Sequence, residues 1–171
     1  MRNWFYEQMA MYAAYHRDRR NQLTHHIGVP MIVFSVLVIA SRLTLIDLSS
    51  GPLTLAAVLM SALLLFYILA APLVGTAAVV LYGALLYFAE KIGGMGSATA
   101  LTVFVGLFIL GWVIQFVGHY FEGRKPALFD NLLQILMAPS FLIAEILFAL
   151  GVEQGLKAEM QARMGVYLKK D

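Results

Sequence analysis

Five apolar stretches, each close to the length of a membrane-crossing helix, dominate this sequence of 171 residues. An α-helix needs about 20 predominantly apolar residues to cross roughly 30 Å of hydrocarbon. Only 13% of the residues are charged, whereas a soluble domain carries about 25%, so a water-soluble domain is excluded. We predict an all-α fold, a polytopic membrane helix bundle with four to five hydrophobic spans, forming one integral membrane domain over residues 1–171. The expected spans are residues 29–46, 53–70, 72–89, 98–117 and 132–150.

Two features bear on how these stretches are divided. The second and third are almost continuous, and the sequence AAPLVG at residues 70–75 predicts a tight turn between them. Pro139 and Glu145 interrupt the last stretch. This segment therefore has two interpretations: it spans the membrane, or it is a re-entrant or tilted helix. A carboxylate as deep as Glu145 is expected to be functional or paired.

The charges predict an orientation. Basic residues flank the first span at Arg17, Arg19 and Arg20, and the loop of residues 118–131 carries Arg124 and Lys125. The positive-inside rule places the N-terminus in the cytoplasm, and four crossings later that loop lies on the same side. The C-terminal tail carries Lys157, Arg163, Lys169 and Lys170. It fits this orientation only if the last segment returns the chain to the cytoplasmic side. We expect the bacterial inner membrane, or the endoplasmic reticulum in a eukaryotic cell. A net charge of +2 gives no indication of nucleic-acid binding.

All four histidines lie in the two polar blocks that this orientation puts on one side of the membrane: His16, His25, His26 and His119. Neutral imidazole is a common ligand of iron, zinc and copper. Spacing alone leaves two interpretations open, ligands of one metal ion or polar residues at the membrane interface. The chain has no cysteine, which excludes thiolate sites and iron–sulfur clusters.

Helical spacing decides which of these side chains can meet. His16 and His25 are nine residues apart, on opposite sides of one ideal helix. A break is needed between them, and we expect it within residues 18–21, with Asn21 available as a cap. Asn21 and His25 share a helical face, whereas His26 points away from His25 and is expected outside the ligand set.

Glu122 follows His119 by three residues and shares its face if the fourth span continues to residue 123. Its carboxylate then lies beside an imidazole, or else pairs with Arg124 or Lys125. Nucleotide-binding and serine-hydrolase motifs are absent from the sequence. Membrane enzymes with two irons need roughly twice as many histidines, so any metal site here is expected to hold one ion.

Two motifs together resemble a known family. The first is Tyr15-His16, then Asn21-x-x-x-His25 and Gly28-x-Pro30. The second is QFVGH at residues 115–119, then Glu122, PAL at 126–128 and DNL at 130–132. They resemble the membrane 2-hydroxy fatty acid dioxygenases of the fungal alpha-oxidation route, and a bacterial-type member is expected. The resemblance implies an Fe(II)-dependent enzyme, without 2-oxoglutarate, that shortens 2-hydroxy fatty acids by one carbon. It implies His16, His25 and His119 as metal ligands and places Asn21 and Glu122 in the catalytic motifs.

Under this dioxygenase hypothesis, a 2-hydroxy acid chelates iron through its carboxylate and hydroxyl, and dioxygen takes a remaining coordination position of the iron. The alkyl tail lies among the spans, in contact with membrane lipid. Arg124 or Lys125 neutralises the headgroup, or instead pairs with lipid phosphate. The alternative is a non-catalytic lipid-binding or scaffold bundle whose histidines are interfacial.

Overall fold

The computed structural model describes residues 1–49 and 51–168, and within them the chain forms seven α-helices and one two-stranded hairpin. Lys169 and Lys170 of the basic tail lie outside the described residues. The elements are α1 (Arg2–Ala14), α2 (Arg19–Ala40), β1 (Thr44–Leu48), β2 (Gly51–Thr54), α3 (Leu55–Ala70), α4 (Pro72–Gly94), α5 (Ser97–Glu122), η1 (Ala127–Phe129), α6 (Gln134–Ala149), α7 (Gln154–Met164) and η2 (Gly165–Tyr167).

The fold is a polytopic membrane helix bundle, as predicted, with three to four candidate spans, slightly fewer than the predicted four to five. Within the described residues, α2, α4 and α5 are long and apolar enough to cross a bilayer. A fourth candidate is the α6–α7 pair, which is bent by 119°. The apolar helix α3 has only 16 residues, which reach about 24 Å at 1.5 Å per residue. It is too short to cross roughly 30 Å of hydrocarbon unaided.

The first predicted span is displaced along the sequence. Helix α2 begins at Arg19, ten residues before the expected start, and ends at Ala40. Asp18 caps its first turn by accepting a hydrogen bond from the backbone N–H of Arg20 at 2.8 Å. Of the rest of the predicted span, residues 41–43 form a turn and residues 44–46 belong to strand β1 of the antiparallel β1–β2 hairpin, a strand that is exposed throughout.

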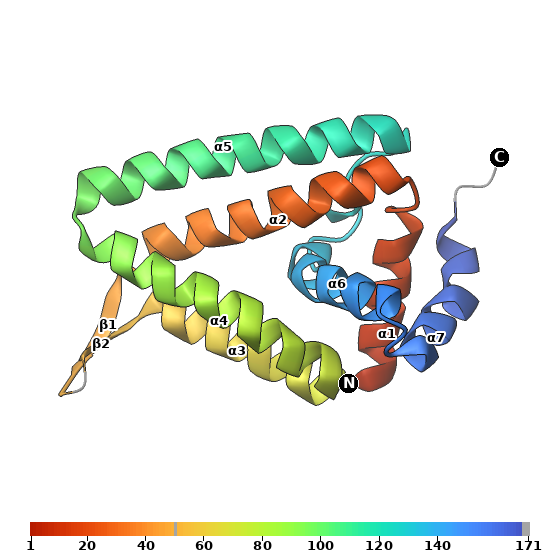
Figure 1. Cartoon of the computed structure of the whole chain (residues 1–171), viewed down its shortest axis with the longest axis horizontal. Helices are drawn as coiled ribbons and strands as arrows, with labels where there is room; N and C mark the ends of the chain where they lie inside the picture. Colours follow the sequence, from red (N-terminus) through yellow and green to blue (C-terminus); the bar gives the residue numbers. More distant parts are fainter. Residues whose placement is uncertain (50, 169–171) are drawn as a thin grey trace.

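Helices α2 and α5 run antiparallel, side by side, and α3 and α4 form a second antiparallel pair (Figure 1). The chain turns between α3 and α4 at Ala71, with Pro72 as the first residue of α4. Glycines let α2 and α5 approach closely. A Cβ atom on Gly118 would lie 2.1 Å from the Oγ1 atom of Thr24, and one on Gly111 would lie 2.7 Å from Ile32.

Helix α6 lies between the two pairs and against α1 (Figure 1). Pro139 within it has no N–H to donate, and such interruptions need compensating partners in a membrane. Two tyrosines bond to neighbouring carbonyls of this helix: Tyr82 donates to the Pro139 carbonyl at 3.3 Å, and Tyr67 donates to the Leu136 carbonyl.

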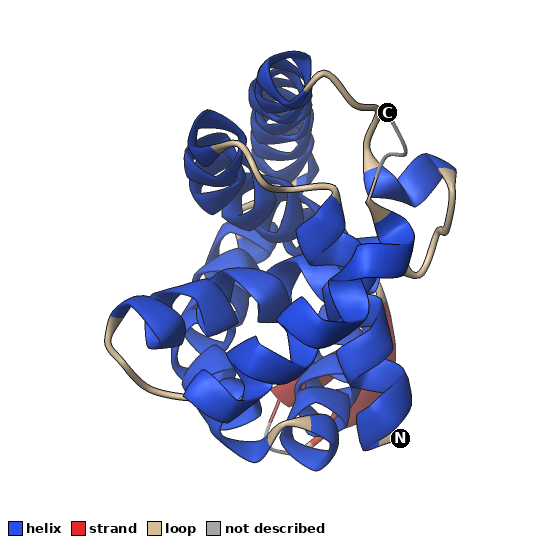
Figure 2. Cartoon of the chain, turned by 90° about the vertical axis from the view of Figure 1, so that its right-hand side faces the viewer, coloured by secondary structure: helices blue, strands red, loops and turns tan. Residues whose placement is uncertain are grey.

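Helix α7 packs on α1 through Leu156 and Met160, which are buried. The described part of the tail therefore returns to the end of the molecule that holds α1. Figure 2 looks onto that end, and the two strands lie behind the helices, at the opposite end.

Candidate metal centre

A break between α1 and α2 brings two histidines together. Residues 15–18 leave the helical path, so that His16, at the corner, and His25, in the second turn of α2, face each other. Their Nε2 atoms lie 3.0 Å apart. The break is present, but it lies at residues 15–18, largely before the predicted residues 18–21, and the prediction that Asn21 caps α2 is wrong. Asp18 is the cap, because its carboxylate reaches the N–H of Arg20, whereas Asn21 already lies inside the helix.

The third imidazole comes from the last turn of α5. The ring centroid of His119 lies 5.1 Å from that of His16 and 5.0 Å from that of His25. One nitrogen from each ring lies within 4.8 Å of the other two, and all three residues are buried. The antiparallel packing of α2 on α5 thus joins segments about a hundred residues apart. His26 does not join this cluster.

Backbone carbonyls orient two of the rings. The Nδ1 atom of His16 lies 2.7 Å from the carbonyl oxygen of Tyr12, and that of His25 lies 2.8 Å from the carbonyl oxygen of Asn21. With the proton on Nδ1, each Nε2 keeps a lone pair that can bind a metal ion. The Nδ1 atom of His119 is buried and has no hydrogen-bond partner among the described residues.

This donor set fits one metal ion. Burial and the neighbouring His25 lower the pKa of His16 well below its usual range, so the imidazole stays neutral, as a ligand must be. Two nitrogens bonded to one ion at about 2.1 Å and subtending a right angle are about 3.0 Å apart, which is the separation of the two Nε2 atoms. Hydrogen-bonded Nδ1 atoms are also the usual arrangement behind metal-bound histidines.

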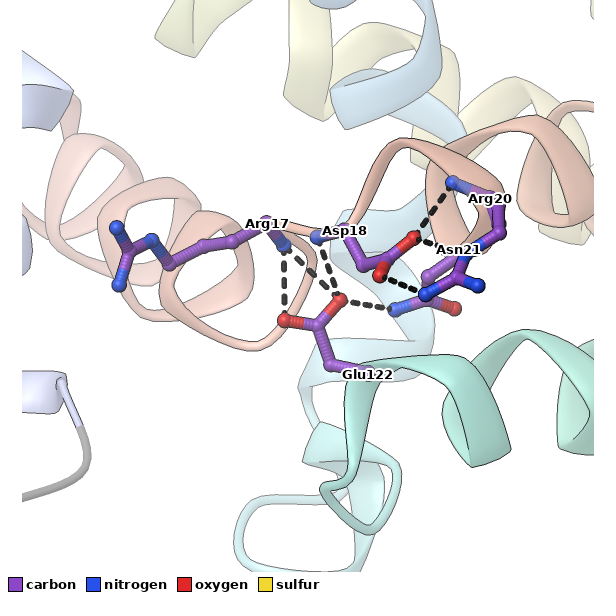
Figure 3. Close-up of polar contacts among 5 residues, drawn as sticks. All are labelled: Arg17, Asp18, Arg20, Asn21 and Glu122. Atoms are coloured by element: carbon purple, nitrogen blue, oxygen red, sulfur yellow. Dashed lines mark hydrogen bonds and ion pairs between the residues drawn. The ribbon is translucent and has the colours of Figure 1, made fainter.

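Glu122 and Asn21 hold the corner that presents His16. The carboxylate of Glu122 accepts hydrogen bonds from the backbone N–H groups of Arg17 and Asp18, at 3.1 and 2.9 Å, and from the Asn21 amide at 2.9 Å (Figure 3). The Asn21 amide also donates to the Tyr15 carbonyl at 3.3 Å. Both side chains thus lie next to the histidines and tie α5 to the α1–α2 corner. These partners of Glu122 are backbone and amide groups that its spacing from His119 could not reveal.

Arg124 and Lys125 lie just beyond this corner. The Arg124 guanidinium donates to the carbonyls of Ala14 and Tyr167, at 3.2 and 3.0 Å, and stacks 3.3 Å from the centre of the Tyr15 ring. Lys125 pairs with Asp130 at 2.6 Å. The hydrogen bonds that Asp130 accepts from Lys125 and Tyr15 lower the pKa of its carboxyl. The structure thus places both cations in the loop after α5, beside the histidine cluster but outside its pocket.

His26 faces a different part of the molecule. Its Nε2 atom lies 3.8 Å from a carboxylate oxygen of Glu145, in a cleft between α2, α6 and α7 that also holds Arg19 and Lys157. At this distance the contact is not a hydrogen bond, and the same Glu145 oxygen has no hydrogen-bond partner among the described residues, so the functional or paired role expected for Glu145 stays a prediction.

The three histidines line one wall of a mostly apolar pocket between α2, α5 and α6. The other lining residues are Tyr12, Val29, Ile32, Val33, Trp112, Gln115, Pro126, Ala127, Leu128, Gln134, Ile135 and Ala138. Gln115 and Gln134 were not expected here. Both are buried, and the side-chain carbonyl oxygen of each lacks a hydrogen-bond partner among the described residues. For Gln115 the sequence held a signal, because it precedes His119 by one helical turn.

The fold and the site together define a membrane protein that gathers three buried imidazoles at an apolar pocket. Comparison with known proteins identifies its family. The chain belongs to the Mpo1-like family, described as 2-hydroxy-palmitic acid dioxygenase Mpo1-like, whose family model matches residues 2–150. It is 38% identical over 156 residues to 2-hydroxy-palmitic acid dioxygenase MPO1 of Saccharomyces cerevisiae, covering 90% of this chain and 86% of the yeast protein. No solved structure matches the chain. The family resemblance seen in the motifs is confirmed.

Proposed function

We propose that this protein is an Fe(II)-dependent dioxygenase that shortens 2-hydroxy fatty acids by one carbon, the net reaction of alpha-oxidation. The observation that carries the proposal is the convergence of His16, His25 and His119 at an apolar pocket between membrane helices. The yeast relative is named a 2-hydroxy-palmitic acid dioxygenase, which supports the substrate class. Three imidazoles leave positions on an iron ion for a chelating substrate and dioxygen.

The reaction balances without a further reductant. A 2-hydroxy acid and one dioxygen give the acid one carbon shorter, carbon dioxide and water, as the bond between C1 and C2 breaks. The substrate loses four electrons, three at C2 and one at C1, and dioxygen accepts four. A ferrous ion bound by the three histidines supplies the one-electron chemistry that triplet dioxygen requires.

The residues of this chain bind and orient the reactants. Apolar side chains of α2, α5 and α6, such as Val29, Ile32 and Trp112, receive the alkyl tail, and each buried methylene contributes about 0.8 kcal/mol. The carboxylate and hydroxyl then lie at the histidine wall. Arg124 and Lys125 immediately precede Pro126, Ala127 and Leu128, which line the pocket, so we assign these two cations to attracting the substrate carboxylate. Asn21 and Glu122 contribute by holding the corner that presents His16.

The test is a comparison of three acids. Purified protein supplied with iron(II) should take up dioxygen with 2-hydroxypalmitate and release a C15 acid, whereas palmitate and 3-hydroxypalmitate should react far more slowly. Only the 2-hydroxy acid forms a five-membered chelate ring. Comparable turnover of all three acids would exclude the chelating mechanism. Protein that holds no stoichiometric iron after anaerobic purification would instead be a non-catalytic lipid-binding or scaffold bundle.

We further propose that the N-terminus and the α5–α6 loop face the cytoplasm, of the bacterial inner membrane or of the endoplasmic reticulum in a eukaryotic cell. Basic residues border both segments, and they lie together at the histidine cluster. The chain has no native cysteine, so single cysteines introduced beside Arg19 and beside Lys125 can be labelled selectively. Both should react with a membrane-impermeant thiol reagent from the cytoplasmic side only. Labelling of either from the other side would overturn this orientation.

A further inference from the structure

The side chain of Gln115 is a buried amide without an evident structural task. It is 4% exposed, and its carbonyl oxygen has no hydrogen-bond partner among the described residues. Such a group destabilises the folded protein unless a partner arrives from elsewhere. Gln115 lines the same pocket as the three histidines. The oxygen itself is covered, so a ligand in that pocket becomes its partner once the amide turns toward the ligand.

The backbone holds Gln115 at the histidine end of the pocket. It lies one helical turn before His119 on α5, so both side chains project from the same face. Gly28 of α2 lies opposite. A Cβ atom on Gly28 would be 3.1 Å from the Nε2 atom of Gln115 and 3.3 Å from its Cδ atom. The amide is thus packed against the α2 backbone and positioned by contact.

Gln134, the other amide in the pocket, differs in this respect. Its carbonyl oxygen is also without a partner, but its Nε2 atom donates to the Gln8 side chain at 2.8 Å. That bond ties α6 to α1, which gives Gln134 a structural role. Of the two amides, Gln115 is therefore the one whose presence only a ligand explains.

We propose that Gln115 recognises the 2-hydroxyl group of the substrate by accepting its hydrogen bond. This inference rests on the proposed function. A 2-hydroxy carboxylate presents several acceptors but only one donor, the hydroxyl. An unpaired carbonyl oxygen matches that donor, and an acid without the hydroxyl leaves the oxygen unpaired. Sites built to bond a hydroxyl discriminate strongly against analogues that lack it. Gln115 is thus a specificity residue for the hydroxyl.

The test measures binding without turnover. Trp4 and Trp112 are the two tryptophans of the chain, and Trp112 lines the pocket. In a Trp4→Phe background, chain-brominated 2-hydroxypalmitate and chain-brominated palmitate should quench Trp112 fluorescence when they bind to the iron-loaded protein under nitrogen. The ratio of the two dissociation constants gives the preference for the hydroxyl. Gln115→Met, which is similar in size and apolar, should reduce this preference about tenfold, as expected for one lost hydrogen bond.

Thermal stability separates recognition from a structural role. If Gln115 serves the ligand, Gln115→Met removes an unpaired buried group and should leave the ligand-free melting temperature equal or higher. A lower melting temperature with an unchanged preference would overturn the proposal, as would an equal loss of affinity for both acids, which would indicate carboxylate recognition. Gln115→Ala removes the same acceptor and should repeat the loss of preference if the Met variant does not fold, although the cavity it leaves lowers the melting temperature.

A matched control removes a buried polar group whose bond is already made. The Ser35 hydroxyl on α2 is fully buried and donates to the Ile32 carbonyl at 2.7 Å, and Ser35 does not line the pocket. Ser35→Ala should leave the preference unchanged, and a loss equal to that of Gln115→Met would refute recognition by Gln115. The preference of the unmodified protein is measured first. If that protein shows no preference for the 2-hydroxy acid, the proposed function itself fails.

Discussion

The two ends of the α2–α5 pair differ in what their polar groups bond to. At the end that holds His16, the Glu122 carboxylate ties the backbone of one corner, and three imidazoles and the Gln115 amide are buried. At the hairpin end, Arg42 donates to the Gly93 carbonyl at 2.7 Å and to the Ser97 hydroxyl at 2.8 Å, and strand β1 is exposed. Among the described residues, no buried side-chain polar atom of the hairpin end lacks a hydrogen-bond partner, whereas the corner end keeps several unpaired.

Close packing is common to both ends. A Cβ atom on Gly118 would lie 2.1 Å from Thr24, and one on Gly93 would lie 1.9 Å from the Ser41 hydroxyl. Tight helix contacts alone therefore do not make a site. What distinguishes the corner end is the set of unpaired buried polar atoms, and the following predictions test whether this contrast is functional.

The largest effect is expected at the histidines. His16→Ala, His25→Ala and His119→Ala should each abolish activity and stoichiometric iron while leaving membrane expression largely intact, because each removes a proposed ligand. His26→Ala should be far milder, since His26 faces Glu145. The test is the iron content per protein, measured by mass spectrometry after anaerobic purification. Iron retained in the His119 variant, or equal loss in all four, would show that the ligand set is wrong.

A smaller effect is expected from crowding the two glycines. Gly118→Ala and Gly93→Ala should each lower the free energy of unfolding by about 1–3 kcal/mol, because the added methyl has no room. Only Gly118→Ala should also weaken iron binding, since it displaces α5 from the corner. Gly106→Ala is the control on the same helix, with nothing within 4 Å of the added atom. Equal iron affinity in the Gly118 and Gly93 variants would remove the functional contrast.

A still smaller effect is expected where the corner is held. Glu122→Gln loses the negative charge that accepts three donors, which loosens the segment around His16. Partners that orient a metal ligand typically change metal affinity 10–100-fold when removed, so we expect at least a tenfold loss, measured by competition with a chelator. At the hairpin end, Glu90→Gln disturbs the bond from Thr54 to Glu90 and should leave iron affinity unchanged. Identical behaviour of the two variants would contradict the assigned role of Glu122.

The smallest effect is a pH dependence near the corner. Asp130 has a lowered pKa because Lys125 and Tyr15 donate to it. A carboxyl with a depressed folded pKa stabilises the protein above its unfolded value of about 3.9, and this contribution is lost as the pH falls through the folded pKa. Asp130→Asn should therefore lower the melting temperature slightly at neutral pH, and its difference from the parent protein should vanish in acid. A difference that grows on acidification would have the wrong sign.

Much of this architecture follows from hydropathy and helical spacing. The apolar stretches correspond to α3, α4, α5 and α6, and the break between His16 and His25 follows from their nine-residue separation. The early start of α2 was missed by hydropathy, because residues 19–28 are largely polar, although the shared helical face of Asn21 and His25 pointed to a helix there. The strand β1 was hidden for the opposite reason. Its residues Leu45 and Ile46 are apolar, and they continue the hydropathy of the preceding helix.

The roles of single polar side chains were less accessible. Sequence spacing put Glu122 near His119, but its partners are mostly backbone N–H groups of residues 17 and 18, which carry no sequence signal. The tight fit of Gln115 against Gly28 depends on the approach of α2 to α5. Such contacts depend on how closely helices far apart in the sequence pack, and a single sequence does not give the spacing between those helices.

The order of the three imidazoles along the chain has a consequence for biosynthesis. His16 and His25 leave the ribosome early, but His119 follows only after α3 and α4 have been made. A nascent chain therefore has two of the three imidazoles and cannot assemble the cluster before α5 is inserted and laid along α2. Formation of the histidine cluster therefore indicates that the chain has been inserted as far as α5, and truncated chains that end before α5 cannot form the cluster.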